Sequence, residues 1–214
     1  MIKKKTALIV GISGQKGSYM AKYLIEKKYI VDGIYMSENY KNLKTLDVLK
    51  KTNLYKFPKF NELRLIKLLK KNFDKIYFFE EQSNLKESLI KNPGTIDGEI
   101  NFLKVILDFI VSQKGIKSKF LYEGSSEIYG DANYQKKITK ESSKKPKNYY
   151  GLSKLIAYEV IKSYRKMFNI PICTAIFFNN KLHLISAGCY KILSKKKIDD
   201  YTIALDKTVL LKKV

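Results

Sequence analysis

Strand-like runs alternate with helix-period segments along most of this 214-residue chain. Short stretches rich in Ile, Val, Tyr and Phe predict six strands, over residues 6–12, 29–35, 53–57, 74–79, 118–126 and 171–178. Segments with apolar residues three and four positions apart lie between them and predict helices, over residues 15–27, 43–51, 61–71, 95–113 and 150–168. This alternation is typical of parallel strands joined by crossover helices, so we expect an α/β fold on one doubly wound parallel sheet.

The segment after Asn179 fits the pattern less well. Residues 191–214 are consistent with a short helix followed by one or two strands, and the pattern does not fix their place in the sheet. No internal repeat or linker interrupts the chain, and its hydrophobic content of 45% favours one compact domain.

Three glycines, Gly11, Gly14 and Gly17, follow the first predicted strand and open the first predicted helix. In a dinucleotide-binding turn, the first glycine allows the tight turn, the second allows close approach of the pyrophosphate, and the third allows the helix to pack against the strand. The helix N-terminus would add amide hydrogens for the anion. An ordinary strand-to-helix turn explains the same spacing, so the motif alone leaves both interpretations open.

A second motif places Tyr150 and Lys154 one turn apart on a predicted helix. A lysine ammonium beside a phenol favours the phenolate, so the tyrosine can exchange a proton with a substrate hydroxyl. The alternative is a surface tyrosine packed on a lysine stem. The polar residues Ser125, Ser126 and Glu127 end the fifth predicted strand, and ligands of parallel sheets bind at such strand ends. A helix cap is the structural alternative for these residues.

Together these motifs resemble the extended short-chain dehydrogenase/reductase family, and within it the GDP-mannose 4,6-dehydratases. The resemblance runs in order through GISGQKGSYMAKYLIEKKYIVDGI, IYFFEEQSNLKESLIKNPG, LYEGSSEIYG, YYGLSKLIAYEVIKSYRKMFNI and AIFFNN, and covers about residues 5–180. It implies a Rossmann-like, NAD(P)-binding domain over residues 1–180. Residues 181–214 would then be a remnant of the family's C-terminal substrate region, with the substrate lobe largely missing.

The resemblance also implies roles for individual residues. Tyr150 would be the acid/base at the sugar 4-hydroxyl, Lys154 would lower the pKa of Tyr150 and hold the nicotinamide ribose, Ser125 would hydrogen-bond the reacting oxygen, and Glu127 would remove the C5 proton. The expected cofactor is NADP, with NAD as the alternative, and no metal is expected. The cofactor-binding residues would be Gly11, Gly14, Gln15, Lys16, Gly17, Ser83, Tyr150 and Lys154.

Several positions depart from the family pattern. Met36 and Ser37 replace an arginine pair after the second strand, which leaves the choice between NADP and NAD open. Phe57 stands at an adenine-contacting acidic position, and Glu80 and Glu81 replace two small residues near the cofactor. Lys181 is a candidate diphosphate contact, whereas His183, the only histidine, is better interpreted as a loop or surface residue than as a catalyst.

The formal net charge of +22 raises the alternative of a polyanion-binding protein. Its distribution argues against specific nucleic-acid binding, because Arg64 and Arg165 are the only arginines and the lysines are spread along the whole chain. Cys173 and Cys189 lack zinc-site spacing and predict buried thiols. The basic N-terminal head is followed by an apolar run that Gly11 interrupts, so we expect no export signal, no membrane span and a cytoplasmic location.

The resulting expectation is a GDP-mannose 4,6-dehydratase-like lyase that converts a nucleotide sugar to its 4-keto-6-deoxy form. The alternative is a catalytically weak or inactive relative that serves as a dinucleotide-binding or subunit-interaction module. The resemblance also makes a homo-oligomer the expected assembly, paired through helices that include the one carrying Tyr150.

Overall fold

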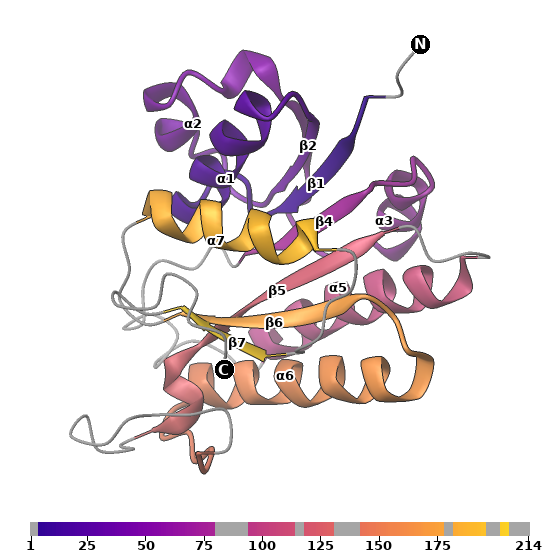
Figure 1. Cartoon of the computed structure of the whole chain (residues 1–214), viewed down its shortest axis with the longest axis vertical. Helices are drawn as coiled ribbons and strands as arrows, with labels where there is room; N and C mark the ends of the chain where they lie inside the picture. The colour runs from indigo at the N-terminus through magenta and orange to yellow at the C-terminus, as the bar shows by residue number, and fades with distance from the viewer. Residues whose placement is uncertain are drawn as a thin grey trace.

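Seven parallel strands form a single sheet in the order β3-β2-β1-β4-β5-β6-β7 (Figure 1). The computed structural model describes residues 4–79, 94–113, 118–130, 142–177, 182–195 and 202–205. All six neighbouring strand pairs are parallel, which confirms the predicted doubly wound sheet. The strands are β1 (Thr6–Val10), β2 (Ile30–Tyr35), β3 (Asn53–Lys56), β4 (Lys75–Phe78), β5 (Lys119–Ser125), β6 (Ile172–Phe177) and β7 (Thr202–Leu205).

Helices cover both faces of the sheet and enclose two cores (Figure 1). On one face α1 and α7 contribute Met20, Leu24 and Cys189, and on the other α3, α5 and α6 contribute residues such as Leu65 and Phe102. The α-helices are α1 (Gln15–Glu26), α2 (Lys41–Thr45), α3 (Glu62–Leu69), α5 (Gly94–Ser112), α6 (Tyr149–Phe168) and α7 (Leu182–Ser194). Two 3₁₀ helices, η1 (Leu49–Lys51) and η2 (Ser126–Tyr129), complete the elements in the described part of the chain.

The central strands are apolar on both sides because both of their faces are covered. Along β1, Ala7 and Ile9 enter the core under α1 and α7, while Leu8 and Val10 enter the opposite core. The order of strands reverses at β1, which lies between β2 and β4. Ligands of such sheets bind at the carboxyl ends of the strands beside this reversal, so a ligand site is expected at that end of β1 and its neighbours.

Two predicted elements differ from the structure. The helix expected over residues 43–51 is broken, because Asp47 adopts a left-handed backbone (φ 53°) between α2 and η1. Near the C-terminus, helix α7 already begins at Leu182, so His183, which the sequence places in a loop or on the surface, lies in a helix and not in a loop. For residues 191–214 we expect a short helix followed by one or two strands. Among the described residues, one such strand is present as β7, which pairs with β6 at the edge of the sheet.

Candidate active site

The glycine-rich turn has the geometry expected of a tight turn with a closely packed helix. Gly11 adopts φ 78°, a left-handed conformation that favours glycine. Its amide and that of Ile12 both donate to the carbonyl oxygen of Ile34 on β2, at 3.0 Å. A Cβ added at Gly17 would lie 2.1 Å from the carbonyl oxygen of Gly11, so a side chain at this position has no space.

This turn fits a phosphate-bearing ligand. Gly14 is the N-cap residue of α1, in extended backbone (φ −67°, ψ 167°), and it has no side chain to cap the helix or shield it. The first turn of α1 contains no acidic residue. Because the first amide hydrogens of a helix lack intrahelical acceptors and carry partial positive charge, they favour an anion at this end of α1.

An ion pair links the glycine-rich turn to strand β5. The Lys16 ammonium, in the first turn of α1, contacts the carboxylate of Glu123, which is 2% exposed. The same ammonium lies 5.3 Å from the centroid of the Phe177 ring on β6. The pair therefore brings the first crossover next to β5, and it gives Lys16, a predicted cofactor contact, a protein carboxylate as a partner.

At the end of β5, Ser125 and Glu127 are tied to the adjoining elements. The Ser125 hydroxyl accepts a hydrogen bond from the Glu127 amide at 3.2 Å and so caps η2. This confirms the capping interpretation for Ser125, and it leaves the hydroxyl hydrogen able to donate to a substrate. The Glu127 carboxylate accepts a hydrogen bond from the side-chain amide of Asn148 at 3.2 Å.

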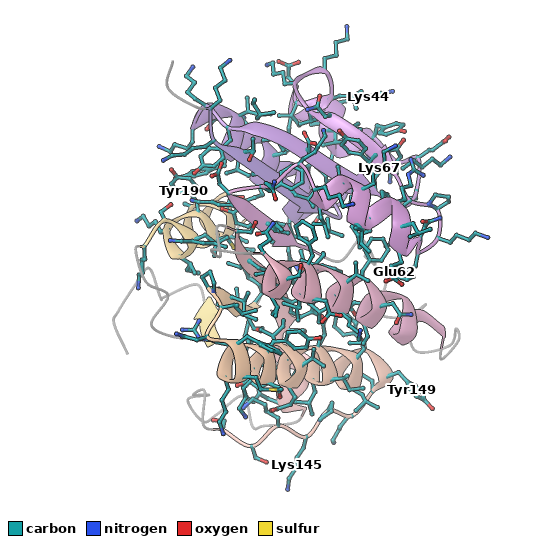
Figure 2. The ribbon with its side chains drawn as sticks, turned by 90° about the vertical axis from the view of Figure 1, so that its right-hand side faces the viewer. Lys44, Glu62, Lys67, Lys145, Tyr149 and Tyr190 are labelled. Atoms are coloured by element: carbon teal, nitrogen blue, oxygen red, sulfur yellow. The ribbon has the colours of Figure 1, made fainter. Side chains whose placement is uncertain are left out.

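The start of helix α6 packs directly against η2. Asn148 caps α6 by accepting a hydrogen bond from the Gly151 amide at 2.7 Å. A Cβ at Gly151 would lie 2.7 Å from the carbonyl oxygen of Glu127, so this glycine permits the close approach. Tyr150 is half-buried in this first turn, whereas its neighbour Tyr149 is 62% exposed and projects away from the ribbon (Figure 2).

Lys154 is fully buried one turn after Tyr150. Its side chain is 0% exposed, and its ammonium lies 2.7 Å from Glu99 Oε1 and 3.1 Å from the Tyr122 hydroxyl oxygen. The ammonium is 5.6 Å from the centroid of the Tyr150 ring. The interpretation of this motif as a surface tyrosine on a lysine stem is therefore wrong.

Glu99, on α5, is the centre of a buried polar cluster that the sequence analysis missed. Its Oε1 accepts hydrogen bonds from Tyr122 at 2.6 Å and from Lys154, and its Oε2 accepts one from Ser153 at 2.9 Å. Burial raises the pKa of the Glu99 carboxyl, but the Lys154 charge and these hydrogen bonds outweigh it and hold the pKa below its usual value.

One signal in the sequence could have identified Glu99. Glu99 precedes Leu103 by four residues and Ile106 by seven, so its side chain is on the same helix face as these apolar residues. An acidic residue on an inward-facing stripe requires a buried partner. The partner, Lys154, is 55 positions away in sequence, so helix periodicity alone does not identify it.

Other predicted positions lie elsewhere or outside the described residues. Phe57 is part of the core and contacts the Phe102 ring, and the Arg64 guanidinium lies over it. Both cysteines are buried free thiols, as predicted. Ser83, Glu80, Glu81, Asn179 and Lys181 lie outside the described residues.

Two kinds of feature are absent from the described ranges of the chain. No group of three or more His, Cys, Asp or Glu side chains is arranged to hold a metal ion in that part of the chain. None of the described helices is both long and apolar enough to cross a bilayer.

The sheet order, the glycine-rich turn and the Tyr150–Lys154 pair on α6 define a short-chain dehydrogenase/reductase fold. Solved structures with this fold include a UDP-Glc/GlcNAc 4-epimerase from Campylobacter jejuni, at a TM-score of 0.70 and 20% identity, covering 81% of this chain and 53% of that one. A dTDP-glucose 4,6-dehydratase from Bacillus anthracis, in complex with NAD, has a TM-score of 0.69 and 20% identity over 83% of this chain and 56% of that one.

Sequence comparison then identifies the family. A family model described as GDP-mannose 4,6 dehydratase matches residues 8–187, so the chain belongs to this family. The GDP-mannose 4,6 dehydratase of Cricetulus griseus is 32% identical, over 83% of this chain and 50% of its own length. The GDP-mannose 4,6-dehydratase of Vibrio cholerae is 30% identical, over 84% of this chain and 51% of its own length. The chain thus spans about half the length of the curated relatives it matches.

Proposed function

We propose that the chain catalyses the 4,6-dehydration of a nucleotide sugar, with GDP-mannose as the substrate and NADP as the bound dinucleotide. One observation carries the proposal: the buried Lys154 lies 5.6 Å from the Tyr150 ring on a helix whose cap, Asn148, holds the Glu127 carboxylate. Support also comes from family membership and from the glycine-rich turn, whose geometry fits a pyrophosphate. The cytoplasm is the proposed location of this activity.

Each residue has a defined task in the proposed reaction. Tyr150, as the phenolate, takes the proton of the sugar 4-hydroxyl, and the Lys154 ammonium stabilises that phenolate. Ser125 donates a hydrogen bond to the same sugar oxygen. Glu127 takes the proton from C5 and gives it to the C6 hydroxyl, which leaves as water. The proton held by Tyr150 then goes to C5, and the hydride that a bound dinucleotide would take from C4 would return to C6, which gives the 4-keto-6-deoxy sugar. Asn148 orients Glu127 for this step through the 3.2 Å hydrogen bond.

The dinucleotide would be held by the glycine-rich turn. Gly11, Gly14 and Gly17 would shape the pyrophosphate site, with Gln15 and Lys16 at the helix N-terminus and Ser83 as a further contact. Lys154 would also hold the nicotinamide ribose. When bound, the nicotinamide accepts a hydride and returns it.

The choice between NADP and NAD depends on the region after β2. Glu38 pairs with Lys56, and Lys56 is the register partner of Tyr35 at the end of β2. The pair offers a cation for a 2′-phosphate and a carboxylate for a ribose 2′-hydroxyl. NADP remains the proposed dinucleotide and NAD the alternative, and titration with both dinucleotides decides between them.

Turnover of GDP-mannose in the presence of NADP tests the proposal. We expect a 4-keto-6-deoxy product from the wild-type chain, detected by its carbonyl absorbance in alkali and by mass spectrometry. Tyr150→Phe should abolish the product, because it removes only the hydroxyl that exchanges the proton. Tyr149→Phe is the matched control. Tyr149 directly precedes Tyr150 in the sequence and is 62% exposed, so this variant should retain turnover. Equal turnover in both variants would reject the role of Tyr150.

A second candidate is a dinucleotide-binding module without turnover. It requires that the Glu99 carboxylate, 2.7 Å from the Lys154 ammonium, offsets so much of the lysine charge at Tyr150 that no phenolate forms. This candidate predicts that the chain binds the dinucleotide and forms no 4-keto product.

The proposed assembly is a homodimer formed through α6. Tyr149, Leu152 and Ile156 are exposed by 62%, 41% and 36% and lie along one stripe of this helix. Light scattering should find a dimer for the wild-type chain and a monomer for the Leu152→Asp/Ile156→Asp variant. A wild-type monomer would contradict the proposed assembly.

A further inference from the structure

The Lys154 side chain on α6 is shielded from water, and its ammonium pairs with the carboxylate of Glu99 on the neighbouring helix α5. We propose that Glu99 is a positioning residue that keeps Lys154 charged and aimed at Tyr150; this inference rests on the proposed function, which assigns Tyr150 as the acid/base. Glu99 itself does not touch the substrate in this account. It acts through Lys154.

The geometry fixes both partners of the pair. Glu99 comes from α5 and Lys154 from α6, and their side chains are 9% and 0% exposed. Tyr122 donates to the oxygen that contacts Lys154, at 2.6 Å, and Ser153 donates to the other oxygen, at 2.9 Å. Both carboxylate oxygens are therefore held in one orientation, and the paired ammonium lies 4.9 Å from the centroid of the Tyr122 ring and 5.6 Å from that of the Tyr150 ring.

Two effects of Glu99 on Tyr150 oppose each other. Its negative charge offsets part of the attraction between the ammonium and a phenolate. However, a fully buried lysine without a carboxylate loses as much as ~3–5 pH units from its pKa and becomes neutral near pH 7. A neutral amine does not stabilise a phenolate by charge at all, so the second effect is the larger one, and Glu99 supports the chemistry of Tyr150.

The surrounding titratable groups leave this balance intact at neutral pH. The titratable groups that contact Lys154 include Glu99 from α5, Tyr122 from β5 and Tyr150 from α6 itself. Burial and the nearby Glu99 charge raise the pKa of Tyr122 well above its usual value, so Tyr122 stays neutral. From β4, Phe78 packs on the Tyr122 ring at 5.6 Å between centroids and adds no charge.

The test is the titration of the Tyr150 phenol in the full chain without cofactor or substrate. Tyrosine labelled with ¹³C at Cζ is followed by NMR, and the signal missing from Tyr150→Phe assigns Tyr150. We expect Glu99→Gln to raise the pKa of Tyr150 by ~1 unit or more. Glu159→Gln is the control, because Glu159 pairs with Lys162 on the exposed side of α6, and it should leave the titration unchanged. An unchanged or lower pKa of Tyr150 in folded Glu99→Gln would overturn the inference.

Two more variants keep the test decisive if Glu99→Gln does not fold. Glu99→Asp retains the charge, so it should fold and keep the Tyr150 pKa closer to the wild-type value than Glu99→Gln would. The double variant Glu99→Gln/Lys154→Met removes the buried lysine that has lost its carboxylate, so it should fold where the single variant does not. A double variant as unstable as the single one would show that charge on Lys154 is not what Glu99 supports.

The titration separates this inference from the proposed function. If the wild-type chain forms no 4-keto product but Glu99→Gln still raises the pKa of Tyr150, the proposed function fails and the role of Glu99 stands. If the wild-type chain is active, the acidic limb of its rate profile, where Tyr150 loses its proton to become the phenolate, should move to higher pH in Glu99→Gln together with the phenol. A profile that does not move would refute the role of Glu99 and leave the proposed function intact.

Discussion

Replacing Gly17 by alanine tests the close packing of α1 against the first turn. The added Cβ would lie 2.1 Å from the carbonyl oxygen of Gly11 and 2.8 Å from the Cα of Ile12. Ordinary contact begins at 3.4 Å, so the helix and the turn must separate by about 1.3 Å. Both neighbours are backbone atoms, which have no rotamer to change. Overpacking of this kind costs ~1–3 kcal/mol, more than the gain in helix propensity of at most ~1 kcal/mol.

Thermal and urea denaturation measure this cost, with Gly98→Ala as the matched control. Gly98 is also a helical glycine, but a Cβ there would meet nothing within 4 Å. For a domain of this size, ~1 kcal/mol changes the Tm by about 2–4 °C. We therefore expect Gly17→Ala to lower the Tm by roughly 3–10 °C, and Gly98→Ala to leave it unchanged or raise it by about 1–4 °C. Equal stabilisation by the two alanines would refute the packing argument for Gly17.

Two further predictions concern a buried lysine and the cap of α6. Burial is the main cause that lowers the pKa of Lys75 from 10.5 to about 8, and the charges of Lys119 and Lys5 are further causes. Between pH 8 and pH 10.5 the unfolded chain therefore binds more protons at this lysine than the folded chain does. The free energy of unfolding should then rise with pH across this window. In urea denaturation, the free energy of unfolding of the wild-type chain should be ~1–2 kcal/mol higher at pH 10.5 than at pH 8, and Lys75→Met should lack this part of the increase. The same dependence of the unfolding free energy on pH in the two proteins would contradict the prediction. Asn148→Ala should cost ~1 kcal/mol of stability and reduce turnover, because it removes both the cap of α6 and the hydrogen bond to Glu127. Asn61→Ala, at the cap of α3, is its control: it should cost similar stability and leave turnover unchanged, and equal turnover in both variants would count against the orienting role of Asn148.

Much of the fold could be predicted from local sequence patterns. The buried strands are short apolar runs, and the helices between them repeat apolar residues at three and four positions, so the parallel sheet follows from the pattern. The first turn was predictable for the same reason, since Gly11 and Gly17 are needed by the backbone at that point. The break at Asp47 was not predictable in this way, because the flanking residues continue a helical pattern and the left-handed conformation of a single residue ends it.

The polar contacts of the candidate site depend on residues far apart in sequence. Lys16 meets Glu123 across 107 positions, and Lys154 meets Glu99 across 55. The motif around Tyr150 and Lys154 predicts which residues share a helix face, but it contains no information on the carboxylate that faces the lysine from another helix. Such pairs are fixed only when the sheet brings α5, α6 and β5 together.

Calorimetric titration of NADPH and NADH into the full chain tests the central claim, that a dinucleotide binds on the turn formed by Gly11, Gly14 and Gly17. The account predicts saturable binding of at least one of the two dinucleotides at one site per chain. Gly14→Val should weaken that binding at least about tenfold, because its side chain would keep the pyrophosphate from the helix N-terminus. Binding of neither dinucleotide to the wild-type chain, or equal affinity in the Gly14→Val variant, would contradict the claim.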